Sequence, residues 1–276
     1  MSEVQKALDY AKQNREQFLS NLIEVLKIPS ISTDAEFKDE VQRAAEWVAE
    51  HLRRLGIENV EIMPTDGGHP VVYGDYIKKP GASTVLVYGH YDVQPADPLE
   101  LWETGPFEPE VRGDLLFGRG SSDMKGQVLA TFSAIEAAIK SGEVPVNLKF
   151  LLEGEEEIGS KNLEPFLQKH AEKFKADVSL NPDAGMMGID MPTITYGLRG
   201  LAYFEINVWG PKADLHSGLF GGAVHNPAQV LAELIAKMHD KKGRITLPGF
   251  YDSVRKLSKQ ERADFARLPN DDAHYL

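Results

Sequence analysis

Short apolar runs separated by long helical stretches constrain the fold of this 276-residue chain more than any other feature. The runs TVLVYG and VNLKFLLE lie on either side of MKGQVLATFSAIEAAIKSG, whose apolar spacing and final Gly142 predict a helix. A second helix is predicted over residues 163–174, ahead of the run ADVSLN. Strands joined by helices of this length form βαβ units. We therefore expect an α/β fold with a largely parallel mixed sheet flanked by helices.

Further elements are predicted before and between these runs. Apolar residues within the first thirty positions are spaced for one face of a helix, and a helix over 40–55 is expected to stop at Gly56. The β-rich runs NVEIM and VVYGDYI follow. The stretch 94–120 is rich in Pro, Gly and acidic residues, which predicts a long loop.

The pattern changes near residue 193. TITYGLRGLAYFEINVWG alternates apolar and polar residues, as a half-exposed antiparallel strand does. A glycine-rich loop, HSGLFGG, leads to a helix predicted to begin at Asn226 and Pro227, which suit the N-cap and N1 positions. We place a domain boundary near residue 196, which gives domains over 1–195 and 196–276.

Composition excludes several kinds of site. The chain has no cysteine, so disulfides and thiolate catalysis are ruled out and any metal ligands must be His, Asp or Glu. The formal net charge of −12 disfavours a nucleic-acid partner, because binding phosphates needs a basic surface. The N-terminal residues lack the pattern of a signal peptide, and no apolar run is long enough to span a membrane. A cytoplasmic location without nucleic-acid or membrane partners is the expectation.

Acidic residues and a histidine lie next to the predicted core strands and helix. His90 follows TVLVYG, glutamates at 155–157 follow NLKFLLEG, Asp183 follows DVSLNP, and Asp123 precedes the helix that starts near Met124. The carboxyl ends of parallel strands meet at one edge of a sheet, so these side chains are expected at one rim. Each alone has an ordinary explanation as a hydrogen-bonded histidine, a helix N-cap, a turn residue or a solvated acidic surface.

Together these residues indicate a metal site. Carboxylates crowded at one rim, with only Lys125 as a cation, repel one another and raise one another's pKa unless bound cations neutralise them. Two divalent metals would do so, and ligands of this kind suit zinc, manganese or cobalt. In GHYD, Asp92 lies two residues after His90 and on the same side of the strand. There it can hydrogen-bond the far imidazole nitrogen and fix the tautomer.

Four blocks of the sequence resemble, in order, the signatures of the co-catalytic zinc exopeptidases. They are GHYDVQP, GRGSSDMKG, LLEGEEEIGS and DLHSGLFGG, and the likeness runs from about residue 15 to 240. That family includes carnosine dipeptidase, glutamate carboxypeptidase, acetylornithine deacetylase and succinyl-diaminopimelate desuccinylase, and DLHSG is similar to its dipeptidase branch. The resemblance implies a catalytic metallopeptidase domain over 1–195. It also implies an inserted, smaller α+β dimerisation (lid) domain, of which 196–276 is the start.

The resemblance implies metal ligands as well. His90 corresponds to a ligand of one metal, Asp123 to the carboxylate that bridges both metals, and Asp183 to the ligand that completes the first site. Glu157 corresponds to a ligand of the second metal, and Asp92 to the residue that orients the histidine.

The resemblance assigns roles in catalysis too. The family pattern Glu-Gly-x-Glu-Glu-x-Gly makes Glu156 the general base, and it leaves Glu155 at a variable, replaceable position and Glu153 outside the metal shell. His216 corresponds to a histidine that reaches the partner subunit's site and stabilises the oxyanion, which implies a homodimer. Without the resemblance, His216 would be a loop histidine that caps a turn. The peptide bond after the bridging aspartate, here Asp123–Met124, is often cis in this family.

The implied function is hydrolysis of a dipeptide or short peptide by a water that two metals activate and Glu156 deprotonates. Deacylation of N-acylated amino acids at the same site is an alternative. For this chain alone, a non-catalytic metal-binding or dimerisation module is another. Family members are longer, so the second metal's histidine and a carboxylate-binding arginine are expected beyond Leu276. His170 and His225 are expected to be structural, and His274 matches no motif.

Overall fold

The computed structural model describes residues 2–142 and 144–269, and the contacts divide the chain into two units, Met1–Tyr196 and Gly197–Leu276. Each unit is described by itself. His274 lies outside the described residues.

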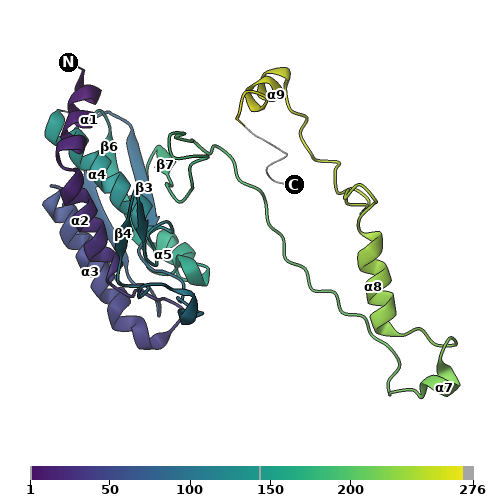
Figure 1. The fold of residues 1–276 in the computed structure, drawn as a ribbon. Coiled ribbons are helices and arrows are strands. Elements are labelled where there is room, and N and C mark those ends of the chain that lie inside the picture. The colour runs from purple at the N-terminus through teal and green to yellow at the C-terminus, as the bar shows by residue number, and fades with distance from the viewer. Residues whose placement is uncertain (1, 143, 270–276) are drawn as a thin grey trace. The chain divides into compact units, whose positions relative to one another are not determined.

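A five-stranded mixed sheet forms the centre of the first unit (Figure 1). In sheet order its strands are β1 (Glu58–Met63), β2 (Val71–Tyr76), β6 (Asn147–Glu153), β3 (Thr84–His90) and β7 (Val178–Leu180). β6, β3 and β7 are mutually parallel, and β2 alone is antiparallel to both of its neighbours. Four of the five strands therefore point the same way. The expected α/β fold with a largely parallel mixed sheet is confirmed.

Helices cover both faces of this sheet (Figure 1). One face carries α1 (Glu3–Gln13), α2 (Arg15–Leu26), α3 (Lys38–Arg54) and α4 (Lys125–Ser141), and the other carries α5 (Leu163–Lys169) and α6 (Ala171–Phe174). Alternate residues of β2 separate the two cores, since Val72 packs with the first group and Tyr73 with the second. The Tyr73 ring meets the Phe174 ring edge-on, with centroids 5.3 Å apart. A sheet buried on both faces explains why its strands read as nearly continuous apolar runs.

α3 shows how the sequence pattern produces this packing. Val41, Ala44, Val48 and Leu52 recur on one side of the helix, and each is 1% exposed or less. Burying each of the larger aliphatic side chains contributes roughly 1.5–3 kcal/mol. Gly56 follows with φ of +85°, in the left-handed region that glycine adopts without a steric penalty. The predicted helix and its stop are confirmed.

The stretch 94–120 contains more structure than its composition predicts. It carries the short helix η2 (Leu99–Leu101) and a hairpin made of β4 (Glu110–Arg112) and β5 (Leu115–Phe117). Gly113, with φ of +62°, occupies the turn of this hairpin. Each strand has only three residues, which is too short for an alternating pattern to be recognised in the sequence.

The described part of the second unit contains α7 (Ser217–Phe220), α8 (Pro227–Lys237) and α9 (Lys259–Phe265). Asn226 caps α8 by accepting from a backbone N–H, and Pro227 is the first residue of the helix, as the sequence predicts. The strand expected over 193–210 is wrong, because these residues pair with no other described strand. An extended segment becomes a strand only where a neighbour completes its hydrogen bonds.

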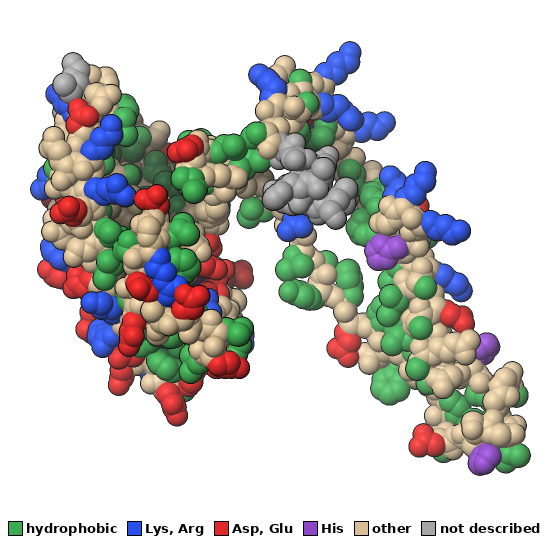
Figure 2. Space-filling model, viewed as in Figure 1, with side chains coloured by type: hydrophobic (Ala, Val, Ile, Leu, Met, Phe, Trp, Pro, Cys, Tyr) green, Lys and Arg blue, Asp and Glu red, His purple; other side chains and the backbone are tan. Residues whose placement is uncertain are grey.

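The apolar side chains of that segment are consequently exposed. Leu198, Phe204 and Trp209 are between 87% and 89% exposed. Figure 2 shows hydrophobic side chains uncovered over the surface of this unit. None of the helices in the described ranges is both long and apolar enough to cross a membrane.

Candidate metal centre

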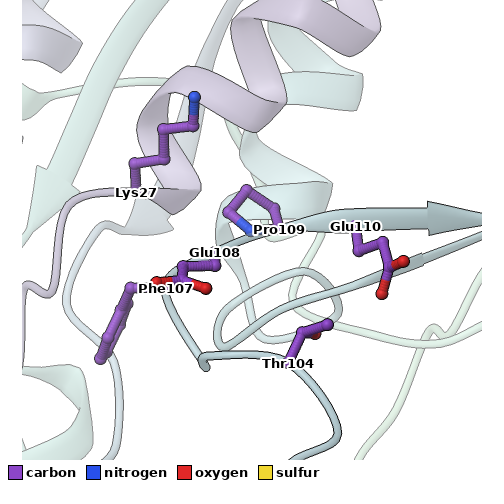
Figure 3. Close-up of a pocket in the computed structure, with 6 residues that line it drawn as sticks. All are labelled: Lys27, Thr104, Phe107, Glu108, Pro109 and Glu110. Carbon is purple, nitrogen blue, oxygen red and sulfur yellow. The ribbon is translucent and has the colours of Figure 1, made fainter.

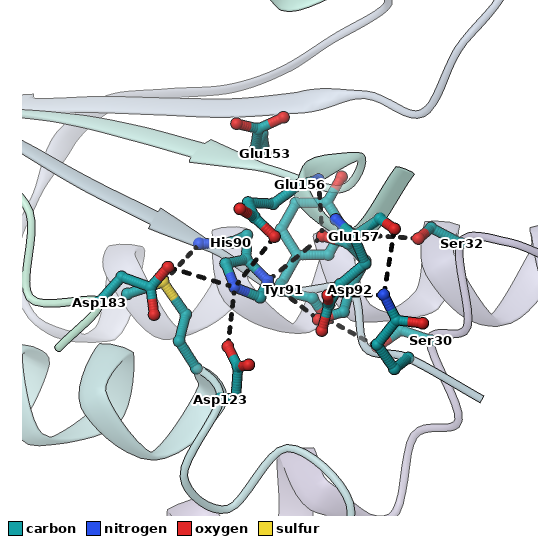
Figure 4. Close-up of polar contacts among 12 residues, drawn as sticks. Ser30, Ser32, His90, Tyr91, Asp92, Asp123, Glu153, Glu156, Glu157 and Asp183 are labelled. Atoms are coloured by element: carbon teal, nitrogen blue, oxygen red, sulfur yellow. Dashed lines mark hydrogen bonds and ion pairs between the residues drawn. The ribbon is translucent and has the colours of Figure 1, made fainter. Parts of the chain in front are cut away.

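The candidate centre lies where β3, β6 and β7 end (Figure 4). β3 and β6 are parallel and in register, so that His90 pairs with Glu153 at their carboxyl ends. The short helix η3 (Glu156–Ile158) follows β6, and Asp183 follows β7. Three segments that are distant in sequence therefore deliver His, Glu and Asp to one edge of the sheet.

His90 is the buried member of this group, with 0% of its side chain exposed. Its Nε2 lies 3.3 Å from Asp123 Oδ1 and 3.8 Å from Asp183 Oδ2. Glu156 Oε2 is 4.0 Å from the same nitrogen. Nε2 is buried and has no hydrogen-bond partner among the described residues. The ligand atoms of His90, Asp123 and Asp183 lie within 4.8 Å of one another, close enough to bind one ion.

Asp123 reaches the centre from the start of α4. It is not a capping residue, because Met124 holds the N-cap position and makes no side-chain cap hydrogen bond. The Asp123–Met124 peptide bond is cis, as the resemblance implies. Close packing then requires glycine at position 126, since a Cβ there would lie 2.0 Å from the carbonyl oxygen of Ser121. The Asp123 side chain remains 66% exposed at the rim.

Asp92 connects the histidine to the glutamates, and its side chain is fully buried. Its Oδ1 accepts from the backbone N–H of Glu156 at 3.3 Å and lies 3.4 Å from His90 Nδ1. Its Oδ2 accepts from the backbone N–H of Glu157 at 3.1 Å and from the Ser32 hydroxyl at 2.6 Å. His90 Nδ1 also lies 3.1 Å from the Asp92 carbonyl oxygen. Asp92 therefore contacts the imidazole and the turn with both glutamates.

The glutamates around η3 occupy different environments. Glu156 and Glu157 are partly exposed, and Gln94 Nε2 donates to Glu157 Oε2 at 2.9 Å. Glu153 is 2% exposed and accepts from the Tyr88 hydroxyl at 2.8 Å. Glu157 lies outside the group of three ligand atoms around His90.

Glu155, which the resemblance leaves at a replaceable position, is only 4% exposed. Its Oε1 accepts from the backbone N–H of His69 at 3.2 Å, and both of its oxygens accept from the Asn162 amide at 3.0–3.1 Å. The preceding residue must be Gly154, since a Cβ there would lie 2.7 Å from the Tyr91 hydroxyl oxygen. Glu155 therefore ties the turn of η3 to the loop before β2.

Burial and mutual repulsion both raise the pKa values of three carboxylates in the centre. Burial raises the pKa of Glu156, and the charges of Glu157 and Asp183 raise it further against the opposing effect of the histidine. Burial also raises the pKa of Glu157 and of Asp183, and the charge of Asp123 adds to both shifts. The centre therefore holds more negative charge than its own cations neutralise.

A divalent cation fits these residues. Burial lowers the pKa of His90, but the hydrogen bond and charge of Asp92 outweigh burial and bring the pKa to about 9. A cation bound at Nε2 would take the place of the proton that this nitrogen carries in the charged imidazole. It would also give Nε2 a partner and neutralise the facing carboxylates. One imidazole nitrogen with carboxylate oxygens is a ligand set that zinc accepts.

Two residues of the centre were not predicted from the sequence. Gln94 continues the alternation of His90 and Asp92 on one side of the chain, so this periodicity could have identified it. Ser32 lies 60 residues from Asp92, and nothing in its sequence context indicates that contact.

His216 lies in the second unit, where it is exposed and occupies the N-cap of α7. Its Nδ1 accepts from the backbone N–H of Gly218 at 3.0 Å. His216 therefore caps a turn, as the alternative interpretation expects, and this hydrogen bond uses one of its two ring nitrogens.

Two cavities are lined by residues outside the His90 group. One of about 510 Å³ is lined by Lys27, Thr104, Phe107, Glu108, Pro109 and Glu110 (Figure 3). The other, of about 740 Å³, lies in the second unit between residues 210 and 229. Neither is lined by a residue of the candidate metal centre.

Comparison with known proteins gives a consistent assignment. Residues 86–260 match the family described as Peptidase family M20/M25/M40. A Cys-Gly metallodipeptidase of Schizosaccharomyces pombe is 38% identical over 268 residues, covering 93% of this chain and 56% of that protein. Human carnosine dipeptidase 1 superposes with a TM-score of 0.77 at 34% identity, covering 100% of this chain and 61% of that chain.

A further solved structure is similar to the same extent. An M20 family metallo-carboxypeptidase from Sulfolobus solfataricus superposes with a TM-score of 0.74 at 37% identity, covering 94% of this chain and 58% of that chain. The chain thus spans little more than half the length of the proteins that it matches.

Proposed function

Because the chain belongs to peptidase family M20/M25/M40, we propose that the full protein is a metallopeptidase that hydrolyses dipeptides or short peptides. The family assignment confirms the resemblance in the four sequence blocks. The observation that carries the proposal is the buried His90 Nε2, which lacks a hydrogen-bond partner and faces Asp123 and Asp183. Relatives named as a Cys-Gly metallodipeptidase and a carnosine dipeptidase support dipeptides as the substrate class.

The geometry supports His90, Asp123 and Asp183 as the proposed ligands, and the resemblance adds Glu157. His90, Asp123 and Asp183 would hold one ion, and Glu157 would hold a second together with Asp123. Zinc suits these ligands, and manganese and cobalt suit them as well. When bound, such ions activate water and polarise the scissile carbonyl.

Glu156 is the proposed general base. It takes a proton from the attacking water and delivers it to the leaving amine. Its backbone N–H is fixed by Asp92, and its carboxylate lies beside the His90 imidazole. In the metal-free chain burial raises the pKa of Glu156, and a higher pKa makes a carboxylate a stronger base. Gln94 holds the Glu157 carboxylate and so keeps the two glutamates in separate roles.

His216 is proposed to act in the site of a second copy, within a homodimer formed through the lid domain that starts at 196–276. Its Nδ1 accepts a hydrogen bond from Gly218, so the neutral imidazole carries its proton on Nε2. An N–H at that atom is the donor that a tetrahedral oxyanion needs. The homodimer, the domain roles and the cytoplasmic location stay predictions.

The test compares Glu156→Gln with wild type in the full protein. We expect turnover of dipeptides to fall by about 10²–10⁴-fold while the metal content, measured by mass spectrometry, stays unchanged. Glu164→Gln, an exposed glutamate in the first turn of α5, is the matched control and should keep full activity. Near-normal activity of Glu156→Gln with metal bound would contradict the assignment. A loss in Glu155→Gln alone would shift the base role by one position.

A substrate panel separates the alternatives. Dipeptides are assayed beside N-acetyl and N-succinyl amino acids at equal metal loading. Turnover of only the acylated amino acids would establish a deacylase. Metal binding without turnover of either class in the full protein would support a non-catalytic module.

A further inference from the structure

The segment over residues 28–32, between α2 and the short helix η1 (Ala35–Phe37), is bound along the chain that leaves β3. The Ser30 hydroxyl donates to the Tyr91 carbonyl at 2.6 Å, and the Ser30 carbonyl accepts from the Val93 N–H at 2.9 Å. Ile31 and Val93 form a parallel bridge. The segment therefore lies directly beside Asp92.

α4 also holds the same segment, through Lys125. Lys125, 1% exposed, donates through Nζ to the carbonyls of Ile28 at 2.7 Å and Val25 at 3.2 Å. Lys125 lies two residues after Asp123, so the segment is bound both to the end of β3 and to the start of α4. The backbone bonds to Val93 and the bonds from Lys125 fix its backbone independently of the side chains at positions 30 and 32.

Ser32 makes the shortest hydrogen bond that the Asp92 carboxylate receives. Its hydroxyl lies 2.6 Å from Oδ2, compared with 3.1 Å for the Glu157 N–H and 3.3 Å for the Glu156 N–H. Ser32 is 7% exposed, so water does not readily replace it. Without this hydroxyl, two longer backbone bonds and the His90 contact would be left to set the rotation of the carboxylate.

We propose that Ser32 is a positioning residue, whose hydroxyl fixes the Asp92 carboxylate so that it holds His90 and the Glu156–Glu157 turn in one arrangement. The proposal rests on the proposed function, in which His90 binds metal and the turn carries the base. A hydrogen bond from Ser32 also spreads the negative charge of Asp92, which limits how strongly Asp92 attracts the proton on Nδ1. Partners of this kind orient a metal-binding histidine.

Ser30 provides a matched control for the test. It belongs to the same segment, is also buried, and makes a hydrogen bond of the same 2.6 Å length, but to the Tyr91 carbonyl instead of a carboxylate. Ser30→Ala and Ser32→Ala therefore each remove one buried hydroxyl. Only the second removes a contact to Asp92.

Two readouts are needed on the 276-residue chain. The first is amide hydrogen exchange at Glu156 and Glu157 in the metal-free chain, which we expect to quicken about tenfold in Ser32→Ala. The second is zinc affinity, measured by competition with a chromophoric chelator, which should weaken about 10–100-fold. Ser30→Ala should change either quantity less than threefold, and Ser32→Thr, which keeps the hydroxyl, should restore wild-type values.

Equal effects of Ser30→Ala and Ser32→Ala on both readouts would overturn the proposal, as would failure of Ser32→Thr to restore them. If Ser32→Ala does not fold, Ser32→Thr is compared with the isosteric Ser32→Val, and equal values for that pair would overturn it too. The two claims fail separately. If the wild-type chain binds no zinc, the metal site is refuted. If amide exchange is nevertheless faster in Ser32→Ala and not in Ser30→Ala, the positioning role of Ser32 stands.

Discussion

His51 should make the first unit less stable as the pH falls. The imidazole lies on the buried face of α3 and is 4% exposed. It stacks between the Trp47 ring, with centroids 4.9 Å apart, and the Phe132 ring, with centroids 5.6 Å apart, and is nearly parallel to both. Its Nδ1 has no hydrogen-bond partner among the described residues. Burial lowers the pKa of His51 from 6.5 to about 4, and the positive charge of Arg54 contributes.

The sign and size of the effect follow from linkage. The unfolded chain binds a proton at this imidazole near pH 6.5, whereas the folded chain does so only near pH 4. The stability that the neutral His51 imidazole contributes is therefore complete above pH 6.5 and is lost as the pH falls toward 4. The free energy of unfolding should drop by about 2 kcal/mol between pH 7.5 and pH 5, and by about 3 kcal/mol once the pH is below both values.

The assay is urea unfolding of wild type and His51→Phe, each measured from pH 7.5 to pH 5 without metal. Phenylalanine fills the same stack and cannot take a proton, so the variant should lack this part of the pH dependence. The difference between the two proteins isolates the imidazole, because all other groups are common to both. His170→Phe is the control, since His170 also contacts an aromatic ring, that of Phe166 at 4.7 Å, but is partly exposed.

A constant difference between wild type and His51→Phe across this pH range would refute the reasoning. So would a His170→Phe curve that loses the same pH dependence as His51→Phe.

Four further results are expected. Glu155→Ala should lower the free energy of unfolding by about 2–3 kcal/mol, because partly buried donors of His69 and Asn162 lose a charged, buried acceptor. A free energy of unfolding within about 0.5 kcal/mol of wild type, the size of an ordinary surface effect, would contradict this. Gly154→Ala should cost about 1–3 kcal/mol in the same assay, since its Cβ would overlap the Tyr91 ring. In the metal-free chain, Asp183→Asn should be at least as stable as wild type at pH 7.5. Burial raises the pKa of Asp183, so its protonated carboxyl contributes stability at low pH, and this contribution is lost as the pH rises through the raised pKa. Zinc should raise the melting temperature of wild type but not of Asp183→Asn, and a zinc-stabilised variant would remove Asp183 from the ligand set.

The sequence is sufficient to predict the helices and strands of the core, because their apolar residues recur over long, periodic stretches. The face of α3 with Val41 and Leu52, and the strands that end at His90 and Glu153, are recognisable without tertiary information. The edge of the sheet where the site forms can be predicted from the connections, since strands joined by helices are parallel and their carboxyl ends meet at one edge, as those of β3, β6 and β7 do.

The remaining features depend on contacts between distant segments. Glu155 is charged and lies in an acidic run, yet its burial depends on donors at His69 and Asn162 that no local pattern reveals. The alternation over 193–210 predicts a strand that the structure does not form, because pairing needs a neighbouring strand, which a single segment cannot specify. Ser32 is a small polar residue in a loop, and its importance lies only in what it faces.

The shortness of β7 has a consequence for how the molecule opens. β7 is the last strand at its side of the sheet and pairs with β3 over only Val178–Leu180, and these residues are largely exposed. Such a strand frays at a cost far below that of global unfolding. An ion held between His90 and Asp183 would join the chain just beyond this strand to the buried centre of the sheet. Loss of the ion would then loosen a local unit of the structure, so that a protease would cut around residues 178–187 faster in metal-depleted protein than in metal-loaded protein.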